Sequence, residues 1–153
     1  MRIFYLFIIL CFFSCSNNQN KNNESSSGDK EIDSLYNVVV AKHDEVMPKI
    51  TNIKNYQMIL RADLENIDNP NDIKEKKEVI LKLVNKLQKG DDAMFDWMNN
   101  FKNKHLNAEF YAKTKKDQII KYLKEEEDKI DGVAMLMLEG IGEAEIFLKK
   151  TPK

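Results

Sequence analysis

Four side chains that can bind soft metal ions recur at helical spacing. His43 and Met47 lie four positions apart, and Met94 and Met98 repeat that spacing later in the chain. Residues four apart share one face of an α-helix. Imidazole and thioether groups suit Cu(I), and a Met/His pair can hold haem iron axially. The four residues therefore form a candidate Cu(I) or haem site, provided that two helices bring the pairs together.

Ordinary packing is the alternative role of these side chains. Methionine commonly fills irregular gaps in helical cores, and a histidine on an apolar face is more often hydrogen-bonded core than a ligand. Pro48 and Gly90 are expected at the same level of the fold, where a bend opposite a weak point could open a pocket. An undefined ligand or a peptide groove is the third possibility there.

The amino terminus has the layout of a secretory signal peptide over residues 1–14. Arg2 gives a positive start, and residues 3–13 form an apolar run. These eleven residues would span about 16 Å as a helix, roughly half of a ~30 Å hydrocarbon core. The run is therefore too short for a permanent transmembrane helix, and we expect it to be processed.

The sequence Phe12-Phe13-Ser14-Cys15 resembles a bacterial lipobox. That resemblance implies that the Cys15 thiol receives a diacylglycerol, that acyl chains such as palmitate anchor it in the membrane, and that Cys15 becomes the first mature residue. Two or more acyl chains hold a protein stably on a bilayer. Ser16 resembles the sorting choice of outer-membrane lipoproteins, which implies an outer-membrane location facing the periplasm. Cleavage elsewhere or a retained anchor is the alternative.

Composition separates the rest of the chain into a linker and a domain. Residues 16–29 contain no apolar side chain, so residues 15–29 are predicted to be a lipidated cysteine and a disordered linker. The chain has 24 basic and 25 acidic residues, a balance that argues against nucleic-acid binding. It has no serine nucleophile motif, phosphate loop or recognisable pair of catalytic carboxylates, so we do not expect an enzyme.

Residues 30–153 carry the heptad pattern of long helices. Apolar side chains recur at steps of three and four from Ile32 to Ile67, with His43 and Gln57 as the polar members. Similar patterns run from Pro70 to about Lys102 and from Ile119 to Phe147, and a turn is expected at residues 103–108. Three helices of similar length predict an all-α fold, an antiparallel three-helix bundle.

Three blocks of this sequence resemble a family of small bacterial lipoproteins, some of which carry the label "viral A-type inclusion protein". The blocks are HDEVMPK at residues 43–49, AMFDWMNNF at residues 93–101 and YLKEEEDKI at residues 122–130. The resemblance implies a location and an architecture but no activity. We therefore expect a lipid-anchored envelope protein that acts as a helical binding module, with a protein partner or with itself through the heptads. The Cu(I)- or haem-binding bundle is the alternative.

Overall fold

The computed structural model describes residues 23–66 and 73–150. In these ranges the chain forms helices α1 (Asn23–Val46), α2 (Ile50–Glu65), α3 (Ile73–Asn100), α4 (Ala108–Lys113) and α5 (Lys116–Lys150), with a 3₁₀ turn, η1 (Met47–Lys49), between the first two. The described residues contain no β-strand. The predicted all-α class is confirmed.

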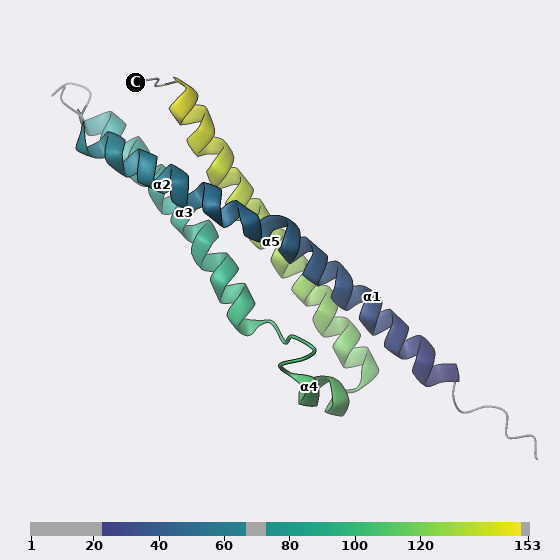
Figure 1. Cartoon of the computed structure of the whole chain (residues 1–153). Helices are drawn as coiled ribbons and strands as arrows, with labels where there is room; N and C mark the ends of the chain where they lie inside the picture. Colours follow the sequence, from purple (N-terminus) through teal and green to yellow (C-terminus); the bar gives the residue numbers. More distant parts are fainter. Residues whose placement is uncertain (1–22, 67–72, 151–153) are drawn as a thin grey trace, which may run out of the picture.

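Three long arms run side by side (Figure 1). The first arm consists of α1, η1 and α2; α3 runs back along it, and α5 runs forward again. Helix α5 packs on α1, α2 and α3, and α2 also packs on α3. This arrangement is the expected antiparallel three-helix bundle, with α5 in contact with both of the other arms.

The first arm is not the single helix that the heptad pattern predicts, because it is interrupted at Pro48. Proline has no amide hydrogen, and its ring clashes with the carbonyl one turn earlier. At this point the chain forms the 3₁₀ turn η1, with Pro48 among its first two positions. The Ile50 amide donates to the carbonyl oxygens of Met47 and Pro48. The arm continues as α2, so buried positions recur on both sides of the interruption, at Val46 and Ile53.

Helix α1 begins inside the segment that the sequence predicts to be a linker. Residues 23–29 have helical backbone and continue the first arm beyond the rest of the bundle. The signal peptide, Cys15 and linker residues 16–22 lie outside the described residues. Among the described helices, none is both long enough and apolar enough to cross a bilayer.

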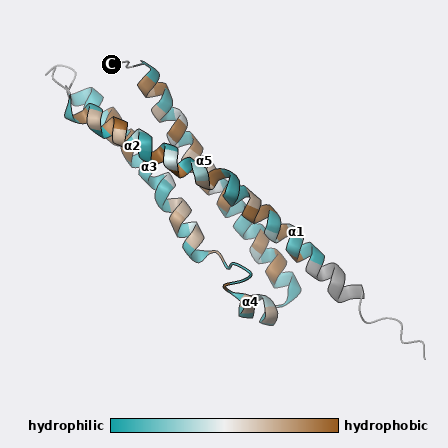
Figure 2. Cartoon of the chain, viewed as in Figure 1, coloured by the Kyte–Doolittle hydropathy of each residue, from teal (hydrophilic) through white to brown (hydrophobic). Residues whose placement is uncertain are grey.

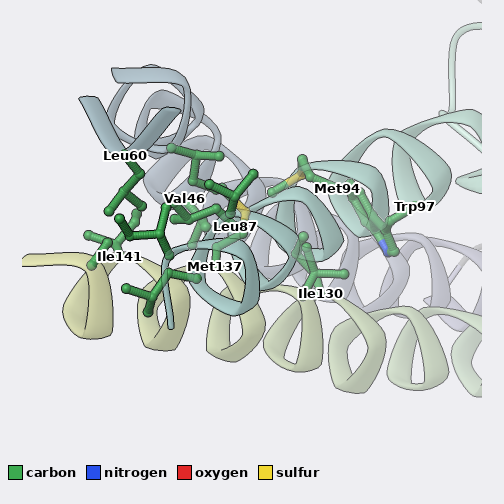
Figure 3. Packing of buried hydrophobic residues seen from close by; sticks show 14 of the residues in the cluster. Val46, Leu60, Leu87, Met94, Trp97, Ile130, Met137 and Ile141 are labelled. Carbon is green, nitrogen blue, oxygen red and sulfur yellow. The ribbon is translucent and has the colours of Figure 1, made fainter. Parts of the chain in front are cut away.

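The core follows the heptad positions of all three arms. Figure 2 shows hydrophobic residues recurring along each helix between hydrophilic ones, and Figure 3 shows their side chains meeting between the ribbons. The largest fully buried side chains are Val39, Ile53, Leu60, Ile80, Leu87, Met94, Leu123, Ile130 and Met137. Burial of each such side chain contributes roughly 1.5–3 kcal/mol, which makes this shared core the main source of stability.

The buried polar residues Gln57, Asp91 and Glu126 each have a polar partner, although the Oδ1 atom of Asp91 has none among the described residues. Gln57, a polar member of the first heptad pattern, donates from Nε2 to Oε1 of Gln88 at 3.0 Å. Buried Glu126 accepts from Nζ of Lys129 at 2.7 Å. Buried Asp91 forms an ion pair with Lys54, whose long side chain reaches solvent. Pairing of this kind offsets the cost of removing these groups from water.

Glycine at position 90 lets α3 lie close to the α5 backbone at Met137. A Cβ atom placed on Gly90 would lie 3.1 Å from the Met137 Cα. One placed on Gly140 would lie 3.5 Å from Cδ2 of Leu87, an ordinary contact. In the described part of the chain, apart from the adjoining backbone of α5 itself and the two chain neighbours, no atom lies within 4 Å of such a Cβ at Gly132 or Gly142. Of these four glycines, Gly90 is therefore the one that close packing of helix backbones requires.

Candidate functional site

A cavity of about 290 Å³ opens between α1, the end of α3 and the loop that follows α3. Its wall contains Val40, His43, Asp44, Trp97, Met98, Phe101, Asn103 and Leu106. Most of these side chains are apolar or aromatic, and the imidazole, carboxylate and carboxamide groups are the polar exceptions. Small-molecule sites typically range from about 300 to 1,000 Å³. The cavity therefore suits one amino-acid side chain or a similarly small group.

The structure divides the four predicted metal ligands into two sets. His43 and Met98 line the cavity together. Met94 is fully buried in the hydrophobic core, and Met47 packs against that core from its edge. Each step of four residues turns the side chain about 40° further around a helix, so Met94 faces inward while Met98 lies on the flank. Met47 falls in η1, where α-helical spacing has ended.

His43 is held by two neighbours. Its Nδ1 atom lies 2.9 Å from Oδ1 of Asp44, and its ring stacks on Trp97 with centroids 5.5 Å apart. Its Nε2 atom is buried, and no described residue hydrogen-bonds to it. The described residues hold no cluster of three or more His, Cys, Asp or Glu side chains able to bind a metal ion. Among the described residues, the soft ligand groups in the cavity wall are one imidazole and one thioether, beside the harder Asp44 carboxylate.

A stack of aromatic rings continues from the cavity into the end of the bundle. Trp97 stacks on Phe101 at 4.8 Å between centroids, and Phe101 stacks in turn on Tyr36 at 5.7 Å and on Tyr122 at 6.4 Å. In Figure 3 the Trp97 side chain extends from α3 into the bundle interior. Offset aromatic pairs add about 0.5–1.5 kcal/mol each beyond their buried area. The inner wall of the cavity is therefore rigid.

Tyrosine hydroxyls hold the loop that forms the outer wall. The Tyr122 oxygen accepts from the Lys102 amide at 2.6 Å, and the Tyr111 hydroxyl donates to the Lys102 carbonyl at 2.7 Å. The Lys104 amide donates to the Tyr36 oxygen at 3.4 Å. Tyrosines from α1, α4 and α5 thus fix one stretch of backbone. The loop presents Leu106, which is 86% exposed, at the cavity.

These phenols act as hydrogen-bonding anchors in their neutral form. Burial raises the pKa of Tyr122 to about 12, although the hydrogen bond from the Lys102 amide opposes that shift. Burial also raises the pKa of Tyr111 well above its usual value, and the neighbouring Tyr122 adds to the effect. Both groups therefore remain protonated throughout the physiological range, and neither is poised for proton transfer.

The sequence did not predict how this end of the bundle is built. The turn expected at residues 103–108 is present, with turn geometry at residues 104–107, but the short helix α4 that follows it was not predicted. The Asn103 Oδ1 atom accepts from the His105 amide at 2.8 Å and so shapes the loop. The concentration of aromatic residues in 101–122 was the available signal, because helical periodicity alone treats Phe110 and Tyr111 as isolated residues.

Comparisons of the chain with protein-family models, curated proteins and solved structures find no match.

Proposed function

We propose that this protein is a lipid-anchored cell-envelope protein whose helical bundle binds an apolar segment of a partner protein at the His43–Leu106 cavity. The observation that carries the proposal is a fixed, almost fully exposed leucine beside an apolar cavity. An exposed apolar side chain gains roughly 1.5–3 kcal/mol when it is covered. Because tyrosine hydroxyls already order the loop, less conformational entropy is lost on binding.

Charge at the cavity favours a basic neighbour for the bound apolar side chain. The Asp44 side chain is 68% exposed at the cavity wall. The lysines of the adjoining loop are engaged elsewhere: Lys104 forms an ion pair with Asp33, and Lys102 lies over the Phe110 ring. A peptide with leucine or phenylalanine next to lysine or arginine therefore matches the site. No catalytic role is assigned to these residues.

The membrane part of the proposal rests on the signal-peptide pattern over residues 1–14, on the lipobox-like sequence at Cys15 and on the family resemblance. The start of α1 and the cavity loop belong to the same end of the bundle (Figure 1), where Lys116 at the start of α5 binds Glu31 of α1 at 3.0 Å. An anchor at Cys15 would place the cavity in the half of the bundle nearer the membrane.

Trp97 provides the test, because it is the only tryptophan in the chain and lies in the cavity wall. The full chain in lipid nanodiscs is titrated with a peptide that carries leucine and phenylalanine between lysines, while tryptophan fluorescence is recorded. We expect a saturable change in fluorescence. Leu106→Ala should weaken the affinity for the peptide about tenfold, since loss of about 1.4 kcal/mol of burial energy corresponds to that factor.

Two controls make the peptide titration decisive. Met58→Ala removes a similarly exposed apolar side chain from α2, away from the cavity, and should leave the affinity unchanged. A peptide with aspartates in place of the lysines should bind more weakly beside Asp44. The proposal fails if the lysine peptide leaves the fluorescence unchanged, or if Leu106→Ala and Met58→Ala bind it equally well.

Binding of Cu(I) is a second candidate, supported by the pairing of His43 and Met98 in one cavity and by the free Nε2 atom of His43. The cavity is at the lower limit of small-molecule sites, so it does not fit a haem macrocycle. Cu(I) should raise the melting temperature of the chain, because a ligand that binds only the folded state stabilises it. Met98→Leu removes the sulfur at similar volume and should abolish that rise. An equal rise in the variant would exclude this site.

A further inference from the structure

Helices α1 and α3 lie apart in the half of the bundle that contains the His43–Leu106 cavity. Helix α5 packs on both of them, but within the described ranges α1 and α3 make hardly any direct backbone contact. Figure 1 shows α1 and the second half of α3 diverging, with α5 between them. Helices that pack directly on each other have axes about 8–10 Å apart. The cavity, which is lined by residues of both helices, lies where this direct packing is missing.

The wall on the α1 side is one face of that helix. Tyr36, Val40 and His43 follow one another at steps of four and three, so they lie on the same face. This face is directed at the end of α3, because the Tyr36 ring stacks on Phe101 and the His43 ring stacks on Trp97. Aromatic rings, instead of close backbone packing, therefore connect α1 with α3 at this level.

The wall on the α3 side is apolar for a turn beyond the cavity. Phe95 and Met98 follow Asp91 by four and seven positions, so the three residues share one side of the helix. This side faces the first arm, because Asp91 pairs with Lys54 of α2. Phe95 and Met98 are 43% and 39% exposed, respectively. The exposed apolar surface therefore continues from the cavity along α3 to Phe95.

Together the two walls form an elongated surface. We call the surface formed by Val40, His43, Phe95, Met98 and Leu106 the α1–α3 groove. The ion pair of Asp91 marks one end of the groove and the loop that carries Leu106 marks the other. From Asp91 to the end of α3 at Asn100 the distance along the helix is about 14 Å, or two to three helical turns.

The rims of the groove carry acidic side chains. Asp44, which is 68% exposed, lies on the α1 rim, and exposed Asp92 lies on the α3 rim, three positions before Phe95. The lysines at the two ends, Lys54 and Lys104, are each engaged in an ion pair. Complementary charge on a partner suppresses wrong pairings and speeds association. The groove therefore favours a segment that is apolar along its centre and basic along both sides.

We propose that the α1–α3 groove binds a basic amphipathic helix of the partner, which lies between α1 and α3 as a fourth helix of this half of the bundle. The inference rests on the proposed function and adds the conformation and charge of the bound segment. A helix satisfies its own backbone hydrogen bonds, whereas an extended segment would need partners that two helical walls do not offer. Apolar side chains at steps of three and four would cover Phe95, Met98 and Leu106. Lysines on both sides of them would face Asp44 and Asp92.

Two peptides that differ at one position test the helical conformation. The first has about 14 residues of leucine, phenylalanine, lysine and alanine, with its apolar residues at steps of three and four and no tryptophan. The second has proline in place of a central alanine on the side away from the groove. Each is titrated into the full chain in phosphatidylcholine nanodiscs while Trp97 fluorescence is recorded, and empty nanodiscs give the background. Proline breaks a helix, so its peptide should bind at least tenfold more weakly. Equal affinities would overturn the helix.

Phe95→Ala tests whether the bound segment extends beyond the cavity. Covering the exposed part of this ring should strengthen binding about three- to tenfold, so the variant should lose that factor in affinity for the helical peptide. Leu81→Ala is the matched control, because Leu81 is 47% exposed on the same helix but lies fourteen positions earlier. It should bind the peptide unchanged. The melting temperature of each variant shows that it is folded. Equal affinities of the two variants would contradict the groove.

Asp92→Asn tests the charge on the α3 rim. The Asp92 Oδ1 atom accepts from Nε2 of Gln88, and asparagine keeps an oxygen for that bond while it removes the charge. The helical lysine peptide should bind about two- to fivefold more weakly, with a smaller difference at high salt. Asp128→Asn removes a charge from an exposed position of α5 and should bind as before. Equal affinities of the two variants would overturn the charge complementarity.

The pattern of results separates this inference from the proposed function. No fluorescence response to either peptide overturns both. A response that Leu106→Ala weakens, but that Phe95→Ala and Asp92→Asn leave unchanged, keeps the cavity as the binding site and overturns the groove. A second copy of the chain in the groove would compete with the peptide, so the apparent affinity would fall as the protein concentration rises. That result would also overturn the proposal.

Discussion

The same substitution at two glycines should have opposite effects on stability, because only one of them is at a helix contact. Replacing a mid-helix glycine with alanine stabilises the helix by up to about 1 kcal/mol. At Gly132 the new methyl group meets no described atom within 4 Å beyond the adjoining part of its own helix, so the full gain should appear. At Gly90 the methyl group would lie 3.1 Å from the Met137 Cα and 3.2 Å from its Cγ.

The cost at Gly90 follows from how little its neighbours can move. Carbon atoms pack best about 3.5–4.0 Å apart, so the contact requires a shift of roughly 0.4 Å. The nearest atom belongs to the α5 backbone, which cannot swing aside as a side chain can. Overpacking of this kind costs about 1–3 kcal/mol. Since the gain in helix propensity is common to both variants, the difference between them isolates this steric cost.

Urea unfolding followed by far-ultraviolet circular dichroism measures the difference directly. We expect Gly90→Ala to be about 1–3 kcal/mol less stable than Gly132→Ala, or roughly 4–12 °C lower in melting temperature. Gly140→Ala, whose methyl group makes an ordinary 3.5 Å contact, should resemble Gly132→Ala. If Gly90→Ala is as stable as Gly132→Ala, then α3 and α5 are not in close backbone contact at Met137, and the reasoning is wrong.

The tyrosine anchors give two further predictions. Tyr122→Phe removes the acceptor of the Lys102 amide and should lower stability by about 1 kcal/mol, with faster hydrogen exchange at that amide but not at Asn85 in the middle of α3. Unchanged exchange at Lys102 would show that the hydroxyl does not hold the loop. Because the pKa of Tyr122 is raised to about 12 in the folded chain, from about 10 when unfolded, its stabilising contribution is complete below pH ~10 and is lost as the pH rises toward ~12. A spectroscopic titration should therefore show one late tyrosine step fewer in Tyr122→Phe, and an identical titration curve would contradict the burial of this phenol.

The heptad pattern predicted the parts of the fold that depend on repeated burial. Ile53, Leu60 and Leu87 occupy seam positions and are buried, because a long amphipathic helix has only one way to hide such a stripe. The pattern could not show that Pro48 would convert one turn to η1 while α2 continues the first arm beyond it. That outcome depends on local hydrogen bonding, which periodicity does not encode.

The candidate site was predicted in part. His43 and Met98 do share a cavity, as the antiparallel pairing of the first two arms indicated. Four-residue spacing predicts that Met94 shares their face, but each such step rotates a side chain about 40° around the helix, and Met94 lies in the core. The sequence does not indicate that Leu106 lines the cavity, because an exposed leucine in a turn carries no signal until the tyrosines that fix the loop are known.

The extension of α1 beyond the bundle sets how far the cavity can lie from a membrane anchor. With an anchor at Cys15, residues 16–22 could span at most about 24 Å even when fully extended, and the helix from Asn23 to His43 covers about 30 Å. His43 and the cavity would then stay within roughly 54 Å of the membrane surface. A partner held on the same membrane would diffuse in two dimensions, so its local concentration near the cavity would be high. A cavity that binds it with only a few kcal/mol of free energy could then remain occupied.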